Sequence, residues 1–444
     1  MRYRDSLSIP TPQIAYSNII SFQGVLSNIL LVLIFISLTF KFQLRIPTEG
    51  YYATLANLLI IILGILFIIF KLCFKNTQIN TRLDFPFLLF SIAIIIGLTH
   101  GALSIGFNSD YLSDMRTFMQ FFLFFIVTSL RFNRKDFSKF LIRLSIVIII
   151  SAITVSVYSV LTSIFNFEHP LDIGNPWPFG EQDIGNVERS AGLIPNSVLL
   201  ITPVILISLH YLKKLSIWQF VGLFLLNLMG ILFTFTRSTW LGVIISILLF
   251  FILTRQRVWK ILALMIVVVL LLNTILASFH LDLFDLINQR TGLIFTESPD
   301  RIGSLQHRIE ESKAFLELFL KNPGFGDGLG ATVGFYSLAL NNYGERSSWH
   351  NAYPMLLGKL GIFGFLGFLF ILLRVFCESL YILRHDPNRT NKILIKTFLS
   401  IFVTVIVTTF SISTLISFDF TILFVTLSAI IAIYGHYLRE SLKK

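Results

Sequence analysis

Charged residues are scarce in this chain of 444 residues: Asp, Glu, Lys and Arg together make up 13% of it, whereas a soluble protein carries about 25%. Hydrophobic residues make up 55%, and the mean hydropathy is +0.79. The apolar residues are grouped in runs of about 20, enough for a helix to cross the roughly 30 Å hydrocarbon core of a bilayer. The composition therefore excludes a string of soluble domains and predicts an all-α polytopic membrane protein.

Cysteine is also scarce, with only Cys73 and Cys377 at the ends of apolar runs. Two such residues indicate neither a disulfide framework nor a metal site. The zinc motif H-E-x-x-H, the nucleophile elbow G-x-S-x-G and the P-loop are all missing from the sequence. The formal charge of +11 does not indicate a nucleic-acid partner, because membrane proteins collect Lys and Arg in their cytoplasmic loops.

The apolar runs predict about twelve transmembrane helices. We divide the chain into residues 1–190 with the first helices and an external loop, 191–279 with further helices, the external segment 280–350, and 351–444 with the last helices and a tail. Lys and Arg predominate in alternate loops, which places both termini in the cytoplasm and the long segments 166–190 and 280–350 outside. The predicted spans lie near 19–40, 51–70, 84–104, 111–130, 140–165, 191–211, 215–235, 237–254, 259–279, 351–373, 393–415 and 418–438.

The external segment 280–350 contains one further predicted helix, which is amphipathic and too charged to span the membrane. Its apolar residues recur at near-helical spacing with charges between them, so we expect it to lie on the outer interface. The stretch NPGFGDGLG, residues 322–330, should end this helix because it is rich in Gly and contains Pro. The apolar positions are Ile302, Leu305, Ile309, Leu316 and Phe319.

Three arginines stand at the predicted external edge and could bind an anion. Arg237 lies among hydroxyl residues in the turn TFTRST, and guanidinium groups grip phosphate oxygens bidentately. Arg308 lies on the amphipathic helix, and Arg189 precedes a span. Each has a plainer interpretation: Arg237 could snorkel to water, Arg308 could pair with Glu311 three residues on, and Arg189 could be an interfacial anchor.

His350 and Asn351 stand at the predicted entrance of a membrane helix, with Pro354 in its first turn. An imidazole there can be partly wet and exchange protons near neutral pH, although a single histidine near a membrane surface is usually only an interface residue. The external acids are best interpreted as a solvated acidic loop, since no D-x-D pair is present to bind a cation. They include Asp172, Glu181, Asp183 and Asp327.

Several motifs, in this order, resemble the bacterial O-antigen ligase and O-antigen polymerase family over roughly residues 185–375. They are RSAGLIPNS (189–197), TRSTWLG (236–242), an arginine on an external helix at 308, NPGFGDGLG (322–330) and HNAYPMLLGKLGIFG (350–364). The resemblance implies an integral-membrane, GT-C-like glycosyltransferase in a bacterial inner membrane. It also implies an undecaprenyl-diphosphate-linked glycan donor, a lipid A-core or glycan acceptor, and an active site on the periplasmic face.

The resemblance also implies the site residues. Two arginines and a histidine of the family fall on Arg237, Arg308 and His350 as catalytic residues, with Arg189 as a further diphosphate-binding position. Asn351 and Ser238 would support them, and neither a metal nor a cofactor is expected. This chain departs from the family at Pro354, usually leucine, and at Lys359, often glutamate. Lys359 is nine residues from His350, on the opposite face of a helix, so we expect it to matter little.

Other functions stay open at this point. A ligase transfers the saccharide chain to lipid A-core, whereas a polymerase joins one lipid-linked repeat unit to another, and both share the motifs above. A related oligosaccharyltransferase would use a protein acceptor. A transporter or flippase should show polar or broken helices near the bilayer midplane, whereas the ionisable residues here gather at the predicted external edge.

Overall fold

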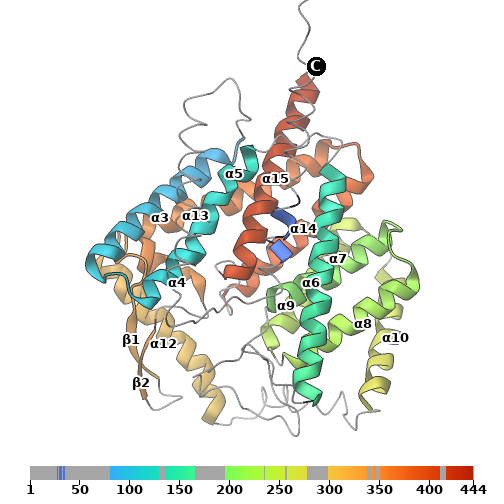
Figure 1. The fold of residues 1–444 in the computed structure, drawn as a ribbon, viewed down its shortest axis with the longest axis horizontal. Helices are drawn as coiled ribbons and strands as arrows, with labels where there is room; N and C mark the ends of the chain where they lie inside the picture. Colours follow the sequence, from blue (N-terminus) through green and yellow to red (C-terminus); the bar gives the residue numbers. More distant parts are fainter. Residues whose placement is uncertain are drawn as a thin grey trace, which may run out of the picture.

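The computed structural model describes most of the chain beyond residue 80, and it is almost wholly helical there (Figure 1). Two of the predicted spans, 19–40 and 51–70, lie outside the described residues except for a few helical positions between 28 and 35. The described ranges are 81–129, 137–165, 196–234, 236–255, 258–277, 299–337, 342–346, 351–410 and 417–443.

Most described helices begin and end close to the predicted spans, because apolar runs of this length form helices in a bilayer. Five of them, α3, α6, α13, α14 and α15, are long and apolar enough to cross a membrane. The count of about twelve and the GT-C-like architecture stay predictions. The helix bounds are α3 Asp84–Ser104, α6 Phe137–Phe165, α7 Asn196–Tyr211, α8 Ile217–Phe233, α9 Arg237–Thr254, α10 Val258–Ala277, α13 Ala352–His385, α14 Arg389–Thr408 and α15 Phe418–Lys443.

The predicted span 111–130 is not one regular helix, which corrects the sequence analysis. It consists of α4 (Ser109–Phe118), the 3-10 turn η1 (Met119–Phe122) and α5 (Leu123–Ser129). Asn108 caps α4 by accepting a hydrogen bond from the Tyr111 N–H at 2.8 Å. The side chains of η1 are all buried, and 3-10 turns of this length commonly join two α-helical pieces.

The external segment contains the predicted amphipathic helix, α12 (Pro299–Lys321), which ends just before NPGFGDGLG as expected. It also contains a β-hairpin that the sequence analysis missed. Strands β1 (Val333–Ser337) and β2 (Asn342–Arg346) pair antiparallel, with Tyr336 opposite Tyr343. Five-residue strands give too short a pattern to be recognised beside the long apolar runs.

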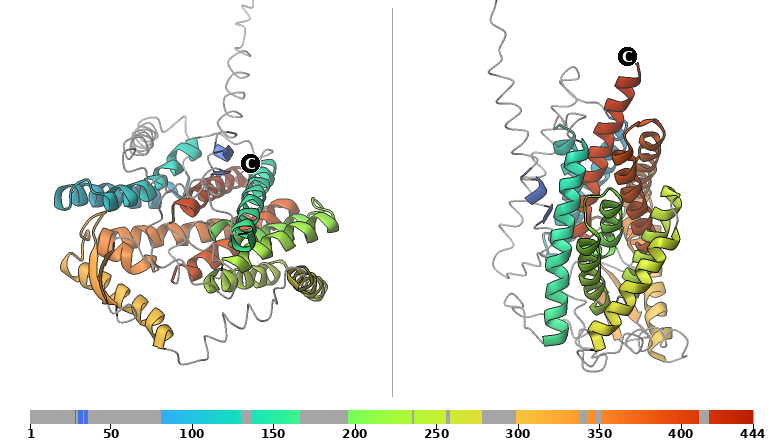
Figure 2. Two further views of the ribbon diagram at one scale, coloured as in Figure 1. Left: turned by 60° about the horizontal axis from the view of Figure 1, so that its bottom comes forward. Right: turned by 90° about the vertical axis from the view of Figure 1, so that its right-hand side faces the viewer.

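Helix α15 occupies the middle of the molecule, and 89% of its apolar stretch is buried. Helices α3, α4 and α5 lie on one side of it and α6 to α10 on the other (Figures 1 and 2). Helix α13 packs against α3, α12 and α15. Helix α12 and the hairpin lie at the end away from the C-terminus (Figure 1), so the two ends of the bundle are built differently.

Candidate functional site

The structure describes the predicted site only in part. Arg189 and His350 lie outside the described residues, as does the side chain of Arg237. The backbone at Arg237, the neighbouring Ser238, and the whole of Arg308 and Asn351 are described. Whether Arg237, Arg308 and His350 meet in one site therefore stays a prediction. The described residues show what holds the backbone at Arg237, Arg308 and Asn351.

Arg237 is the first residue of α9, after a tight turn from α8 that the sequence analysis predicted. The Trp240 indole N–H donates to the Ile231 carbonyl at 3.0 Å across this turn. The hydroxyl of Thr234 donates to the same carbonyl at 2.7 Å, and that of Thr236 donates to the Thr234 carbonyl at 3.1 Å. These two hydroxyls therefore close the turn that leads into α9.

Arg308 lies on α12 and is partly buried. Helix α12 is held against α13 by Phe315 and Leu318: a Cβ at Gly358 would lie 2.8 Å from Phe315 Cδ1 and 3.4 Å from Leu318 Cδ2. Arg308 is seven residues before Phe315, about 10 Å along the helix axis. The close packing on Gly358 therefore fixes the distance of this arginine from α13. Glu311, its suggested partner, is buried with 1% exposure.

Asn351 caps α13, which confirms the predicted helix entrance. Its side-chain oxygen accepts a hydrogen bond from the Tyr353 N–H at 3.2 Å. The Ala352 N–H donates to the Thr409 carbonyl at 3.5 Å, and the Tyr353 hydroxyl donates to the Ile406 carbonyl at 2.9 Å. The start of α13 is thus fastened to the end of α14, immediately after the position of His350.

Lys359, which was expected to matter little to the site, is buried in an ion pair that the sequence did not reveal. It is completely buried, and its ammonium group pairs with the Asp114 carboxylate of α4. The same carboxylate oxygen accepts the Gly330 N–H at 2.7 Å. Two opposite charges in two predicted spans, 351–373 and 111–130, were the signal that could have revealed this pair, because an ionisable residue in a bilayer needs a partner.

The glycine-rich loop 322–330 completes a break in α13. Gly361 has φ 62° and ψ −169°, which interrupts the helix and separates two N–H groups from the two carbonyls that they would bond in a regular helix. The loop supplies all the missing partners. The bonds are Asp327 N–H to the Gly358 carbonyl at 2.9 Å, Gly328 N–H to the Lys359 carbonyl at 3.0 Å, Ile362 N–H to the Pro323 carbonyl at 2.9 Å and Phe363 N–H to the Gly324 carbonyl at 3.3 Å.

This insertion explains the glycines of both motifs. Gly326, Gly328 and Gly330 have φ of 71°, 96° and 87°, which L-residues with a side chain rarely adopt. A Cβ at Gly361 would lie 2.2 Å from the Gly324 carbonyl oxygen, and one at Gly101 of α3 would lie 1.9 Å from the Leu329 carbonyl oxygen. The backbones of α3, the loop and α13 are therefore in direct contact.

Comparison with known families identifies this part of the chain. The family model described as O-antigen ligase matches residues 222–369. Residues 222–369 are thus similar to the O-antigen ligase family. The match runs from α8 into α13 and encloses Arg237, Arg308, His350 and Lys359, so the resemblance inferred from the motifs is confirmed. A search of curated proteins found no match.

The residues that contact Lys359 and the glycine loop do not all lie within the matched region. The glycine loop and the break at Gly361 lie inside the matched residues 222–369, whereas Asp114 of α4 and Gly101 of α3 lie before them. Leu329 donates its N–H to the Gly97 carbonyl of α3 at 2.9 Å. The N-terminal half of the chain thus contributes two contacts to the glycine loop: the backbone of α3 and the Asp114 carboxylate of α4.

Proposed function

We propose that this protein is an O-antigen ligase: a glycosyltransferase that moves a saccharide chain from undecaprenyl diphosphate to a hydroxyl of lipid A-core. The reaction would occur at the periplasmic face of a bacterial inner membrane, without a metal and with inversion at the anomeric carbon. The family match carries the proposal, because it encloses the three residues predicted to be catalytic, Arg237, Arg308 and His350. The membrane helices support a lipid-linked substrate.

The two arginines would hold the diphosphate. Arg237 begins α9, and the unpaired N–H groups and dipole of a helix N-terminus favour an anion there. Arg308 would approach from α12, with Arg189 assisting. As the bond from C1 to the phosphate oxygen breaks, its electron pair goes to the leaving diphosphate. Two preorganised guanidinium groups near a low-dielectric bilayer would stabilise that charge by several kcal/mol.

His350 would act as the general base. It would accept the proton of the acceptor hydroxyl while that oxygen forms its bond to C1 from the side opposite the leaving diphosphate. General-base catalysis is typically worth about 10²- to 10⁴-fold. Asn351 would support it by fixing the backbone at the start of α13 through its cap, and Ser238 would support Arg237 from the first turn of α9.

The order of elements along the chain suggests how Arg308 and His350 would keep a fixed distance from each other. Helix α12 with Arg308, the glycine loop, the hairpin and then His350 follow one another without interruption. The loop is joined to α13 on both sides of Gly361 by backbone hydrogen bonds. One continuous segment, whose glycine loop is bonded into the break of α13, thus connects the proposed phosphate-binding arginine to the proposed base.

The test is glycan transfer by the purified full-length protein in EDTA. Undecaprenyl-diphosphate-linked saccharide is the donor, and lipid A-core or a second donor molecule is the acceptor. We expect transfer to lipid A-core, reduced at least about 100-fold in His350→Ala, Arg237→Ala and Arg308→Ala. Arg255→Ala, at the other end of α9, is the matched control and should transfer normally.

The other outcomes separate the remaining functions. Lengthening of the donor glycan, without transfer to lipid A-core, would establish a polymerase with the same site. Normal transfer in all three variants would refute the site, and loss of transfer on removal of metal would refute the metal-independent mechanism. A wild-type protein that moves lipid-linked glycan across proteoliposomes without transferring it would establish a transporter.

A further inference from the structure

The hairpin of β1 and β2 presents two exposed tyrosines side by side. In β1, Val333 and Phe335 are 6% and 8% exposed, and the strand packs against α12. Tyr336 points to the other face, as alternation along a strand requires, and is 47% exposed; Tyr343, directly opposite in β2, is 61% exposed. One face of the hairpin is therefore anchored and the other is aromatic.

The ring of Tyr343 is held in place by a glycine. A Cβ at Gly334 would lie 1.9 Å from the Tyr343 hydroxyl oxygen, 2.7 Å from Cζ and 3.1 Å from Cε1. The phenol therefore lies across the bare backbone of Gly334, diagonally opposite in the ladder, an arrangement by which an aromatic residue covers a strand glycine. A ring that lies against the backbone and is still 61% exposed would lose little conformational freedom on binding a ligand.

The chemistry of such a face suits a sugar. Aromatic rings carry negative charge on their faces, which attracts the polarised C–H groups on the flat side of a pyranose. Tyrosine hydroxyls can in addition donate to and accept from sugar hydroxyls. Tyrosines also gather at membrane interfaces, where they contact lipid head groups, so the location of the hairpin along the chain decides between these ligands.

That location favours the glycan of the donor. The hairpin lies between α12, which carries Arg308, and His350, and β2 ends at Arg346. The four residues from there to His350 can span at most about 14 Å. A saccharide whose C1 faces His350 would therefore begin within about 14 Å of the end of β2.

We propose that Tyr336 and Tyr343 form a stacking platform for the saccharide chain of the lipid-linked donor, beyond the sugar that reacts. This proposal depends on the proposed function for the identity of the donor. The platform binds successive sugar rings of a long donor and has no contact with a donor that carries a single sugar.

The experiment compares donors of two lengths. Transfer is measured with undecaprenyl diphosphate carrying one sugar and carrying several repeat units, for wild type, Tyr336→Ala and Tyr343→Ala. We expect KM for the long donor to rise about three- to tenfold per tyrosine, the range of one aromatic contact, with kcat and the short donor unchanged. Tyr→Phe variants keep the ring and most of the effect. Trp218→Ala, an equally large substitution of an 83% exposed side chain on α8, is the control.

The platform would be overturned if KM rose equally for both donors, or if KM did not rise for the long donor. A loss of activity that depends on vesicle lipid and not on donor length would assign the tyrosines to the membrane interface instead. Gly334→Ala is a second variant, because it displaces the Tyr343 ring without removing it, and it should raise KM for the long donor too.

Direct binding of the lipid-free repeat-unit oligosaccharide separates this proposal from the proposed function. Saturation-transfer NMR on the full-length protein should show contacts that Tyr336→Ala and Tyr343→Ala weaken by the same factor. If wild type binds this oligosaccharide but transfers no glycan, the proposed function fails and the platform stands. If it transfers glycan but the variants bind the oligosaccharide normally, the platform fails alone.

Discussion

Helix α13 carries two buried ion pairs, one on each side of its midpoint, and they are built differently. Near the site end, Lys359 and Asp114 pair with side-chain exposures of 0% and 8%. Near the other end, Glu378 pairs with Arg439 of α15, with exposures of 5% and 14%. Lys359 reaches its partner with a single ammonium group, whereas the guanidinium of Arg439 donates to both oxygens of Glu378.

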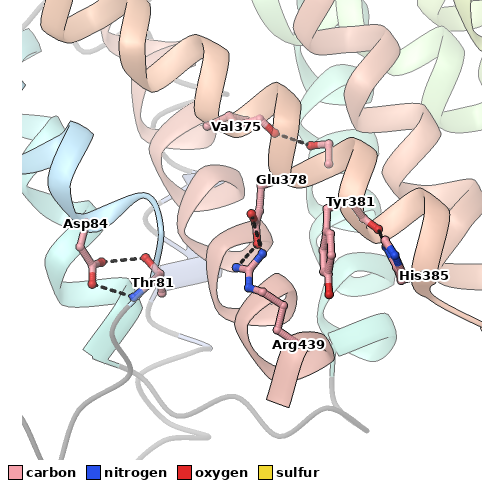
Figure 3. Close-up of polar contacts among 8 residues, drawn as sticks. Thr81, Asp84, Val375, Glu378, Tyr381, His385 and Arg439 are labelled. Atoms are coloured by element: carbon pink, nitrogen blue, oxygen red, sulfur yellow. Dashed lines mark hydrogen bonds and ion pairs between the residues drawn. The ribbon is translucent and has the colours of Figure 1, made fainter. Parts of the chain in front are cut away.

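The surroundings of the two pairs also differ. The guanidinium of Arg439 lies over the ring of Tyr381, 4.9 Å from its centroid (Figure 3). Gly435 leaves room for Glu378, since a Cβ at Gly435 would lie 1.8 Å from the Glu378 Oε1. These contacts join the second half of α13 to α15. The Asp114 carboxylate instead also accepts the Gly330 N–H, so its pair holds a loop that is inserted into a broken helix.

The Glu378 pair joins two helices, whereas the Asp114 carboxylate of the Lys359 pair also binds the glycine loop. A charge that is fully withdrawn from water is costly unless it is paired. The chain keeps one at Lys359, in the region that matches the ligase family, where the glycine loop meets α13. Substitutions at the two pairs should therefore differ in their effect on transfer and not only on stability.

The largest effect is expected from Lys359→Met, which leaves Asp114 buried without its cation. The free energy of unfolding should fall by about 3–5 kcal/mol, the usual cost of breaking a buried pair from one side. Glycan transfer should be lost because the loop loses its anchor. Thermal unfolding in detergent and the transfer assay measure the two effects. The double variant Lys359→Met with Asp114→Leu removes both charges and should recover most of the stability; a double variant as unstable as the single one would contradict the coupling.

Gly361→Ala should have the next largest effect. The new Cβ would meet the Gly324 carbonyl at 2.2 Å and force a residue with a side chain into positive φ, which together cost about 2–3 kcal/mol. Transfer should fall with stability, as the assays above measure. Gly106→Ala separates the two causes, because Gly106 also has positive φ, 80°, but nothing within 4 Å of the added Cβ. Equal losses at both glycines would mean that contact with the loop contributes nothing.

Arg439→Lys should have a smaller effect and, unlike the first two substitutions, should spare transfer. Lysine keeps the charge but loses the bidentate geometry and the planar group over Tyr381, which should lower the free energy of unfolding by about 1–2 kcal/mol. The transfer rate at a temperature below the unfolding transition should equal that of wild type. A loss of transfer in the folded variant would remove the distinction between the two ends of α13.

The same contrast shows what could be predicted from the sequence. Apolar runs predicted most of the described long helices closely, since a bilayer leaves a chain of this kind little alternative. The span 111–130, which is broken into α4, η1 and α5, is the exception. The cap at Asn351 and the tight turn before Arg237 followed from local residue types and are confirmed. Features determined by one or two neighbouring residues, or by the hydropathy of a run of about 20 residues, could be predicted.

Features that depend on distant residues were not predicted. The broken helix at Gly361 exists because a loop some 35 residues earlier supplies its hydrogen bonds, and helix α13 otherwise reads as one continuous run. Lys359 was assigned to an unimportant helix face because its partner is 245 residues away in the chain. The catalytic roles of Arg237, Arg308 and His350 stay predictions that rest on the family resemblance and that the transfer assay would test.

The smallest predicted effect tests the same contrast through two tyrosine hydroxyls. At the site end, the Tyr353 hydroxyl donates to the Ile406 carbonyl at 2.9 Å. At the other end, the Tyr434 hydroxyl donates to the Asp386 carboxylate at 2.6 Å and accepts from the Asn391 amide at 2.7 Å.

Tyr353→Phe keeps the packing against Phe410, at 4.5 Å between ring centroids, and should lower the free energy of unfolding by only about 1 kcal/mol. It should nevertheless slow transfer several-fold, because it loosens the helix start that follows His350. Tyr434→Phe removes two hydrogen bonds and should cost more stability, about 2 kcal/mol, without slowing transfer. If both variants slow transfer in proportion to the stability that they lose, the start of α13 has no special role in placing the base, and the two ends of the helix differ only in how they are packed.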